Sequence, residues 1–318
     1  MTPRVSVIVP SFRRPDSLGR CLAALAAQTR APDEIVIGAR ADDADTLAAA
    51  EAARLAGQAV RVATTPARGV VAAMQAALDA SVGDIIALTD DDARPRPEWI
   101  AGLLAHFAHA GDVGGVGGRD WQPYERGDAS RVGLVQWCGR VIGNHHLGAG
   151  PARDVDVLKG VNCAFRGPLL RAVGFDARLH GGGAQLYWEL ALCLPLRRAG
   201  WRLVYDPAVA VDHDVAPRHD ADNLHRGIFA EAPLRDAVHN ETVALLDGRG
   251  SAGGALYLAW ALLIGTGEAP GVAQVARRML QGDRDVLRRW RATLAGRFAG
   301  RATARRTPRA LQVPPPGR

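Results

Sequence analysis

Apolar residues in the first 120 positions follow two alternating patterns. Short runs rich in valine and isoleucine predict strands over residues 5–10, 34–38, 60–63 and 85–89. The alanine-rich stretches between them predict helices from about residue 15, over about 44–56 and over about 69–81. Strands that alternate with helices are typical of a parallel sheet with crossover helices, so we expect an α/β fold with a doubly wound sheet.

The rest of the chain is less regular. Tryptophans and histidines lie among glycines between about residues 121 and 160, which predicts long loops and short strands. A helix is expected over about 187–199, and strand-like residues then run up to His213. The apolar segment 255–264 is too short to span a bilayer by itself and suits a core helix or an interfacial segment. An arginine-rich helix over about 272–300 follows it.

Composition and cysteine usage narrow the class of protein. A chain of 318 residues that is 48% hydrophobic can bury a large core. The first residues lack a basic segment followed by a long apolar stretch, so we expect no secretory signal and a cytoplasmic protein. The four cysteines show no paired spacing, which argues against a zinc site and against a disulfide framework.

The positive charge is concentrated at the end of the chain. Residues 277–318 hold twelve arginines and two aspartates, within a net charge of +6 for the whole protein. A nucleic-acid partner is not expected, because this charge lies in a tail that lacks interleaved aromatic residues. Peripheral contact with the anionic inner leaflet of a membrane explains the charge better.

Polar residues follow three of the predicted strands where each strand ends. Pro10 ends the first and Ser11 follows it, segment 39–43 follows the second, and Asp90–Asp92 follow the fourth. Ligands of doubly wound sheets bind at the carboxyl ends of the strands, so these stretches predict a cleft along one edge. Three adjacent aspartates repel one another, and either solvent or a bound cation must offset that cost.

Four ordered stretches resemble the family 2 glycosyltransferases. They are VSVIVPSFRRPDSLGRCLAALAAQT, GDIIALTDDDARPRPEWI, LKGVNCAFRGPLLRAVGFD and WELALCLPLRRAGWRLVYDPAVAVDH. The resemblance runs over about residues 4–215 and implies the GT-A fold, a Rossmann-like, mostly parallel sheet flanked by helices. The apolar and arginine-rich segments beyond it predict a C-terminal helical extension. The resemblance implies a catalytic domain over 1–215, with a nucleotide-sugar half at about 1–120 and an acceptor half at about 121–215. Residues 216–300 would form the helical extension, peripheral to a membrane, and residues 301–318 a disordered basic, proline-rich tail.

The resemblance also implies an activity and a cofactor. Such enzymes transfer a sugar from a nucleotide-diphosphate sugar to an acceptor hydroxyl, with inversion, and use Mg²⁺ or Mn²⁺. By the family pattern, Asp92 is the direct metal ligand, Asp90 contacts the ribose or the metal, and His213 completes the metal or diphosphate contact. Asp91 either holds the turn or touches the sugar. A sugar or lipid-linked acceptor, in cell-surface polysaccharide or glycolipid synthesis, is expected.

The acceptor side departs from the family pattern at one position. Relatives carry an acidic pair at the start of the helix expected over 187–199, whereas this chain has Trp188-Glu189 and Ala191. Glu189 is therefore the candidate catalytic base, and its other interpretation is a glutamate stabilised by the helix N-terminus. The resemblance places Lys159, Asn162 and Trp188 on the acceptor side.

The nucleotide side departs more strongly. The two aspartates that relatives carry after the second strand are replaced here by the segment 38–41, which leaves the base unidentified. Pro10, Ser11, Arg40, Asp42 or Asp43, Arg68, Asp90 and Asp91 are the candidate nucleotide-sugar residues.

Two other functions compete with glycosyl transfer as interpretations of these residues. An inactive nucleotide-sugar-binding scaffold would explain both departures, but the presence of Asp90, Asp92, Glu189 and His213 argues against it. A nucleotidyltransferase would need a glycine-rich loop after the first strand, and SFRRPDS has no glycine. The run GGVGG over 114–118 lacks the spacing of a dinucleotide fingerprint and predicts a strand that approaches another backbone closely.

Overall fold

The computed structural model describes residues 2–122, 129–216, 229–309 and 313–316. The strands are β1 (Val5–Ser11), β2 (Glu34–Arg40), β3 (Val60–Thr65), β4 (Ile85–Leu88), β5 (Ala93–Pro95), β6 (Val113–Trp121), β7 (Leu134–Val135), β8 (Val141–Ile142), β9 (Arg153–Val155), β10 (Cys163–Arg166) and β11 (Arg202–His213). The helices are α1 (Pro15–Ala26), α2 (Ala44–Leu55), α3 (Val70–Ala80), α4 (Trp99–His109), α5 (Gly167–Val173), α6 (Trp188–Arg198), α7 (Glu231–Leu263), α8 (Val272–Leu280) and α9 (Val286–Arg306).

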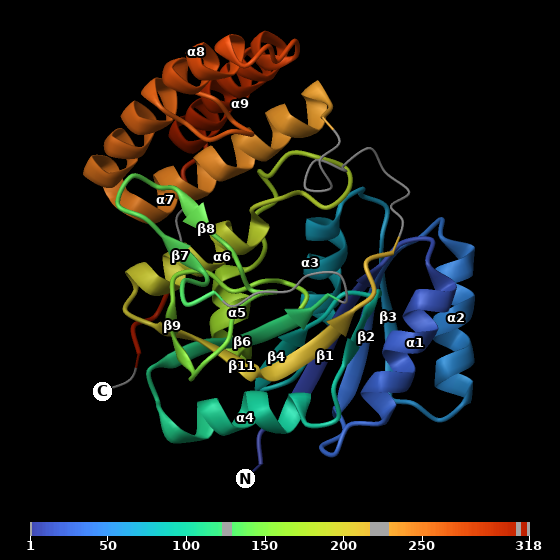
Figure 1. Ribbon diagram of the computed structural model, residues 1–318. Helices are drawn as coiled ribbons and strands as arrows, with labels where there is room; N and C mark the ends of the chain where they lie inside the picture. Colours follow the sequence, from blue (N-terminus) through green and yellow to red (C-terminus); the bar gives the residue numbers. More distant parts are fainter. Residues whose placement is uncertain (1, 123–128, 217–228, 310–312, 317–318) are drawn as a thin grey trace.

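One large mixed sheet forms the centre of the molecule (Figure 1). Its strand order is β3-β2-β1-β4-β10-β6-β11-β5, and β9 pairs with β11. The strands β3, β2, β1 and β4 pair in parallel, as do β6 and β11, whereas β10 runs antiparallel to both of its neighbours. The predicted α/β fold with a mostly parallel, helix-flanked sheet is confirmed.

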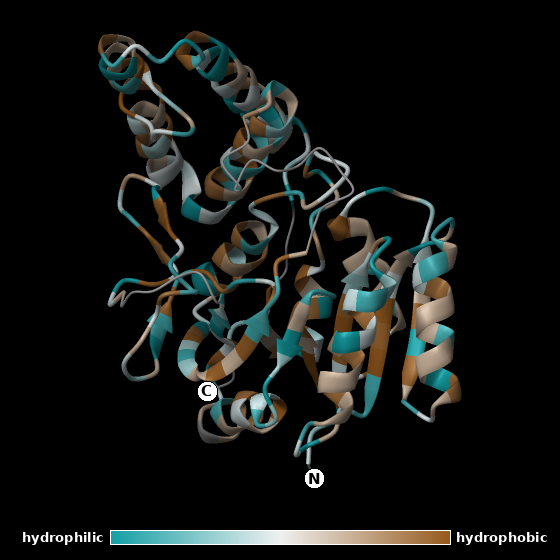
Figure 2. Ribbon diagram, turned by 45° about the vertical axis from the view of Figure 1, so that its right-hand side comes forward, coloured by the Kyte–Doolittle hydropathy of each residue, from teal (hydrophilic) through white to brown (hydrophobic). Residues whose placement is uncertain are grey.

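Side-chain alternation along the strands builds a core on each face of this sheet. In β1, Val5, Val7 and Val9 pack with residues of α1 and α4, whereas Ile8 packs with residues of α3, α5 and α6. The strands are hydrophobic along most of their length, and the polar residues lie on the outer faces of the helices (Figure 2). The sheet edge that carries the polar strand ends is therefore rigidly supported on both faces.

Glycines let β6 run close to its neighbours. A Cβ atom at Gly118 would lie 1.6 Å from the Val209 carbonyl oxygen, and one at Gly117 would lie 2.7 Å from the Asn162 carbonyl oxygen. Neither contact can be relieved without moving backbone. The close backbone approach expected from GGVGG is confirmed.

The C-terminal helices differ from the sequence expectation. The single helix expected over 272–300 is two helices, α8 and α9, because Gly282 adopts a φ of 77° in the turn between them. The segment 255–264 belongs to α7, which kinks at Gly250, where φ is 69°. None of the described helices is both long and apolar enough to cross a membrane.

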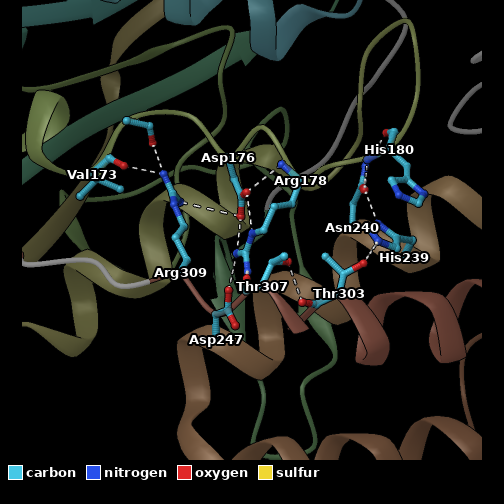
Figure 3. Close-up of polar contacts among 11 residues, drawn as sticks. Val173, Asp176, Arg178, His180, His239, Asn240, Asp247, Thr303, Thr307 and Arg309 are labelled. Carbon is cyan, nitrogen blue, oxygen red and sulfur yellow. Dashed lines mark hydrogen bonds and ion pairs between the residues drawn. The ribbon is translucent and has the colours of Figure 1, made fainter. Parts of the chain in front are cut away.

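Helix α7 shares a buried core with α6 and the central sheet. Val243, Leu245 and Tyr257 of α7 belong to the same buried cluster as α6 and the sheet. Asn240 fixes the loop before α6, because its amide donates to the His180 and Leu186 carbonyl oxygens and its oxygen accepts from the His180 amide at 2.7 Å (Figure 3).

The expected disordered tail over 301–318 is corrected for the part of it that the structure describes. Helix α9 continues to Arg306, and the Arg309 guanidinium donates to the Gly174 carbonyl oxygen at 2.8 Å (Figure 3). The Trp201 indole donates to the Pro314 carbonyl oxygen at 2.7 Å, and Val313 packs against the core. The composition suggested disorder because it is basic and proline-rich, but Val313 finds an apolar surface at the end of α6.

Candidate active site

Strand pairing brings the polar strand ends together. Leu88 of β4 lies opposite Ile8 of β1, and Ala93 of β5 lies opposite His213 of β11. The turn that joins β4 to β5 holds the three aspartates, so it lies between the ends of β1 and β11. This arrangement builds a polar cluster at the sheet edge where the sequence predicted a cleft.

Asp90, Asp92 and His213 form a group suited to a metal ion. One ligand atom from each lies within 4.8 Å of the others. The His213 Nε2 atom is 3.3 Å from Asp92 Oδ1, and the other Asp92 oxygen accepts from the Ala216 amide at 2.9 Å. The structure therefore brings together the three residues expected to hold the metal.

Asp120 supports the far side of His213 and was not found from the sequence. Its Oδ2 atom lies 3.5 Å from His213 Nδ1 and accepts from Lys159 Nζ at 2.5 Å, and its side chain is fully buried. A carboxylate on the second imidazole nitrogen orients a histidine whose first nitrogen faces a metal site. The feature that could have indicated this role is the position of Asp120 near the end of β6, which pairs in parallel with β11.

Arg14 holds the aspartate turn and was also missed. Its guanidinium lies 2.9 Å from an Asp91 oxygen and 3.2 Å from an Asp92 oxygen. The other Asp91 oxygen accepts from the Ser11 hydroxyl at 2.8 Å. Of the two roles expected for Asp91, these contacts match holding the turn. Ser11, expected to bind the nucleotide-sugar, supports the same turn.

The charges in this cluster shift its pKa values strongly. Burial, and then the charge of Asp92, raise the pKa of Asp90 to about 7. Burial also raises the pKa of Asp91 to about 6, although Arg14 opposes this. Burial alone would lower the pKa of His213, but hydrogen bonds to Asp120 and Asp92 raise it to about 9. His213 and Lys159 overcome burial and hold the pKa of Asp120 well below its usual range.

A divalent cation fits these residues. Two carboxylates and an imidazole are donors that Mn²⁺ and Mg²⁺ accept. Without a metal, the raised pKa values of Asp90 and His213 mean that the cluster favours added positive charge. Positive charge at this point is what a divalent cation supplies. The buried Asp120 Oδ1 atom has no hydrogen-bond partner among the described residues.

Glu189 lies in the first turn of α6. The turn begins after Tyr187, whose φ is 71°, and the Gly160 amide donates to Glu189 Oε1 at 3.4 Å. Gly160 follows Lys159, which reaches Asp120. The loop over 159–160 thus connects the candidate base to the support of the metal cluster.

Two residues expected on the acceptor side lie in the core instead. Asn162 is fully buried, accepts from the Trp99 indole at 2.8 Å and donates to the Arg119 and Val209 carbonyl oxygens. Trp188 is 8% exposed and packs against Phe175. The family resemblance suggested ligand contact, but these side chains are occupied by buried interactions.

Replacing Asn162 with alanine is expected to destabilise the fold by about 3 kcal/mol or more, because buried donors and acceptors lose their partners. Urea unfolding with circular dichroism measures this free energy. An unchanged free energy of unfolding, together with a raised KM for acceptor, would return Asn162 to the acceptor side.

The remaining nucleotide candidates lie around the ends of β2 and β3. Arg40 pairs with the exposed Asp42, and its guanidinium lies 4.9 Å from the centre of the Phe12 ring. Asp43 is occupied as the N-cap of α2 and accepts from the Arg13 amide at 2.6 Å. Arg68 is exposed, and Pro10 pairs in register with Gly38.

Comparison with known proteins identifies the family. A family model described as glycosyl transferase family 2 matches residues 6–166, just over half of the chain. The protein is a family 2 glycosyltransferase. A pre-mycofactocin glycosyltransferase of Mycobacterium tuberculosis is 31% identical to it over 211 residues, which are 63% of this chain and 41% of the relative. The glycosyltransferase thus spans less than half the length of the curated relatives it matches.

Solved structures show the same fold. The mannosyltransferase PcManGT of Pyrobaculum calidifontis, in complex with GDP-Man and Mn²⁺, matches with a TM-score of 0.57 and 17% identity over 97% of this chain and 89% of that one. GalNAc-T7, with UDP, GalNAc and Mn²⁺, matches with a TM-score of 0.58 and 16% identity over 76% of this chain and 49% of that one. TarS 1-349 of S. aureus, in complex with UDP-GlcNAc, matches with a TM-score of 0.56 and 14% identity over 95% and 91%. The glycosyltransferase has the GT-A fold.

Proposed function

We propose that the glycosyltransferase transfers a sugar, with inversion, from a nucleotide-diphosphate sugar to an acceptor hydroxyl, and that it requires Mg²⁺ or Mn²⁺. The observation that carries this proposal is the cluster of Asp90, Asp92 and His213 at the carboxyl edge of a GT-A sheet. Structures of the same fold, determined with GDP-Man or UDP and Mn²⁺, support a nucleotide donor and a metal.

Each residue of the cluster has a task in this reaction. Asp92, Asp90 and His213 would hold the cation, and Asp120 would keep His213 facing it. Arg14 and Ser11 fix the aspartate turn, so the ligand oxygens are placed before the donor binds. When bound, the cation would neutralise the diphosphate charge that grows as the sugar leaves.

Glu189 is assigned the role of general base. Direct inversion needs a carboxylate that accepts the proton of the acceptor hydroxyl as it attacks the anomeric carbon opposite the departing diphosphate. Glu189 lies in the first turn of a rigid helix, and the Gly160 amide orients its carboxylate. Lys159 precedes Gly160 on the same loop and is a candidate for acceptor contact.

The donor class is tested by titration calorimetry with UDP, GDP and dTDP, each in Mn²⁺ and in EDTA. We expect one nucleotide to bind with at least tenfold higher affinity when Mn²⁺ is present, because a cation held by Asp90, Asp92 and His213 would supply positive charge to the diphosphate. The contradicting result is that no nucleotide binds under either condition, which would favour the inactive scaffold.

We also propose that α8 contacts the anionic inner leaflet of a membrane, and that the acceptor belongs to cell-surface polysaccharide or glycolipid synthesis. Val272, Met279 and Leu280 of α8 are 56%, 55% and 91% exposed, and Leu263 and Ile264 at the end of α7 are also exposed. Arg277 lies on the same helix. Exposed apolar side chains beside arginines are typical of a helix that binds in the membrane interface.

Replacing Met279 and Leu280 with serine is expected to lower binding to phosphatidylglycerol vesicles by about tenfold, because two apolar side chains no longer enter the interface. Co-sedimentation at low and high salt measures this. Leu55→Ser, at the 73% exposed end of α2, is the matched control. Equal vesicle binding by all three proteins would contradict the membrane contact.

A further inference from the structure

A cleft of about 1040 Å³ lies between the C-terminal helices and the β7–β8 hairpin. Its walls include Arg140 of the hairpin, Trp260 of α7, Arg277 of α8 and Arg289 of α9, together with Tyr187 and Phe229. Figure 1 shows this hairpin directly beneath α7. The cleft is large enough for a drug-sized ligand, and none of the metal-cluster residues lines it.

The arginines give the cleft an excess of positive charge. Arg140, Arg277 and Arg289 line the cleft and have no carboxylate partner among the described residues. The acidic Glu241 at the wall is already paired, because Arg297 lies 3.3 Å from it and the Tyr257 hydroxyl donates to it at 3.0 Å. Exposed Glu268 is the remaining carboxylate in the described lining.

The Arg289 side chain is restrained and has an unsatisfied hydrogen-bond donor. Its guanidinium lies 4.1 Å from the centre of the Phe229 ring, which restrains the side chain. Its Nε atom is buried and has no hydrogen-bond partner among the described residues. A buried donor of this kind is costly unless a ligand or water satisfies it, and a guanidinium presents paired donors that match phosphate oxygens.

Tyr187 relates the cleft to the candidate catalytic base along the chain. Tyr187 lines the cleft and lies two residues before Glu189, at the start of α6. The hydroxyl to be glycosylated must reach Glu189, so an acceptor that occupies the cleft would extend past Tyr187 toward the base.

We propose that this cleft binds a phosphate group of the acceptor. Arg277 and Arg289 hold the phosphate, and Arg140 contacts the same phosphate from the side of the hairpin. The faces of Tyr187 and Trp260 contact the apolar part of the same molecule. The proposal deepens the proposed function and rests on it, because it names the acceptor as a phosphorylated molecule.

Binding of inorganic pyrophosphate in EDTA tests the site without the metal cluster. We expect R277Q/R289Q to weaken pyrophosphate binding by roughly 10- to 100-fold, and Arg140→Gln, which alters the hairpin alone, by about fivefold, because charge-assisted hydrogen bonds are lost. R301Q/R305Q removes the same charge from exposed positions of α9 outside the cleft lining, and it should bind pyrophosphate like the wild type. Unchanged binding in the cleft variants, or an equal loss in the control pair, overturns the proposal.

A second arm identifies the source of the phosphate. Dihexanoylphosphatidic acid and glucose 1-phosphate are titrated against the same variants. Tighter binding of the first assigns the group to a lipid phosphate, and tighter binding of the second assigns it to a soluble sugar phosphate. Either result supports the phosphate site, provided that the R277Q/R289Q variant no longer binds the same ligand.

Nucleotide titration with Mn²⁺ on the same proteins separates this inference from the proposed function. Retained nucleotide binding without pyrophosphate binding rejects the phosphate site alone. If the wild-type protein binds no nucleotide, the proposed donor is rejected, whatever the cleft binds.

Discussion

Replacing Glu189 with glutamine is expected to lower kcat by about 10²- to 10⁴-fold. General base catalysis contributes a factor of this size to the rate, and glutamine cannot accept the hydroxyl proton. Glutamine keeps an oxygen that can accept from the Gly160 amide, so the first turn of α6 is preserved. KM for the nucleotide-sugar is expected to stay within about twofold, because uniform binding is unaffected.

Glu51→Gln is the matched control for this change. Glu51 is exposed on α2 and pairs with Arg54, far along the chain from the acceptor half. Its kcat should equal that of the wild type. A Glu189→Gln protein with wild-type kcat would show that Glu189 serves only as a glutamate stabilised at a helix N-terminus.

Replacing Asp92 with asparagine is expected to abolish measurable Mn²⁺ binding and to lower kcat by about 10³-fold, because the carboxylate proposed to hold the cation loses its charge. Asparagine still offers an oxygen to the Ala216 amide, so the turn keeps one of its contacts. Electron paramagnetic resonance of free Mn²⁺ measures the binding, and steady-state transfer measures the rate.

Asp79→Asn, on the exposed side of α3, removes an equal charge away from the cluster and should leave both measurements unchanged. Because Asp92 also pairs with Arg14, thermal unfolding must be followed in the same proteins. A folded Asp92→Asn protein that binds Mn²⁺ like the wild type would exclude Asp92 as a metal ligand.

The fold was predictable where local pattern decides it. The strands β1 to β4 begin where the β-branched runs predicted, and α2 and α3 differ from their expected bounds by about one residue at their ends. The break between α8 and α9 was missed because Gly282 lies among charged residues that suit a continuous helix. The order of the antiparallel strands, with β10 between β4 and β6, depends on long-range pairing that no local pattern records.

The sequence predicted the site residues that lie at strand ends, but not the residues that contact them. The family resemblance and the strand order named Asp90, Asp92 and His213, which the structure brings together. Arg14 and Asp120 were missed because their roles depend on the direction in which a side chain leaves its strand or helix. Asn162 was misassigned for the converse reason, since a polar residue close to a site can be fully satisfied inside the core.

Lys159 has a practical consequence for studying this protein in solution. It is the only lysine of the sequence, its side chain is 33% exposed, and its amine reaches Asp120 beside His213. An amine-directed reagent therefore has a single side-chain target in the whole chain, and that target adjoins the metal cluster. Mass spectrometry of the labelled peptide, with and without donor and Mn²⁺, would measure how far labelling of Lys159 changes when the site is occupied. The measurement needs neither acceptor nor turnover.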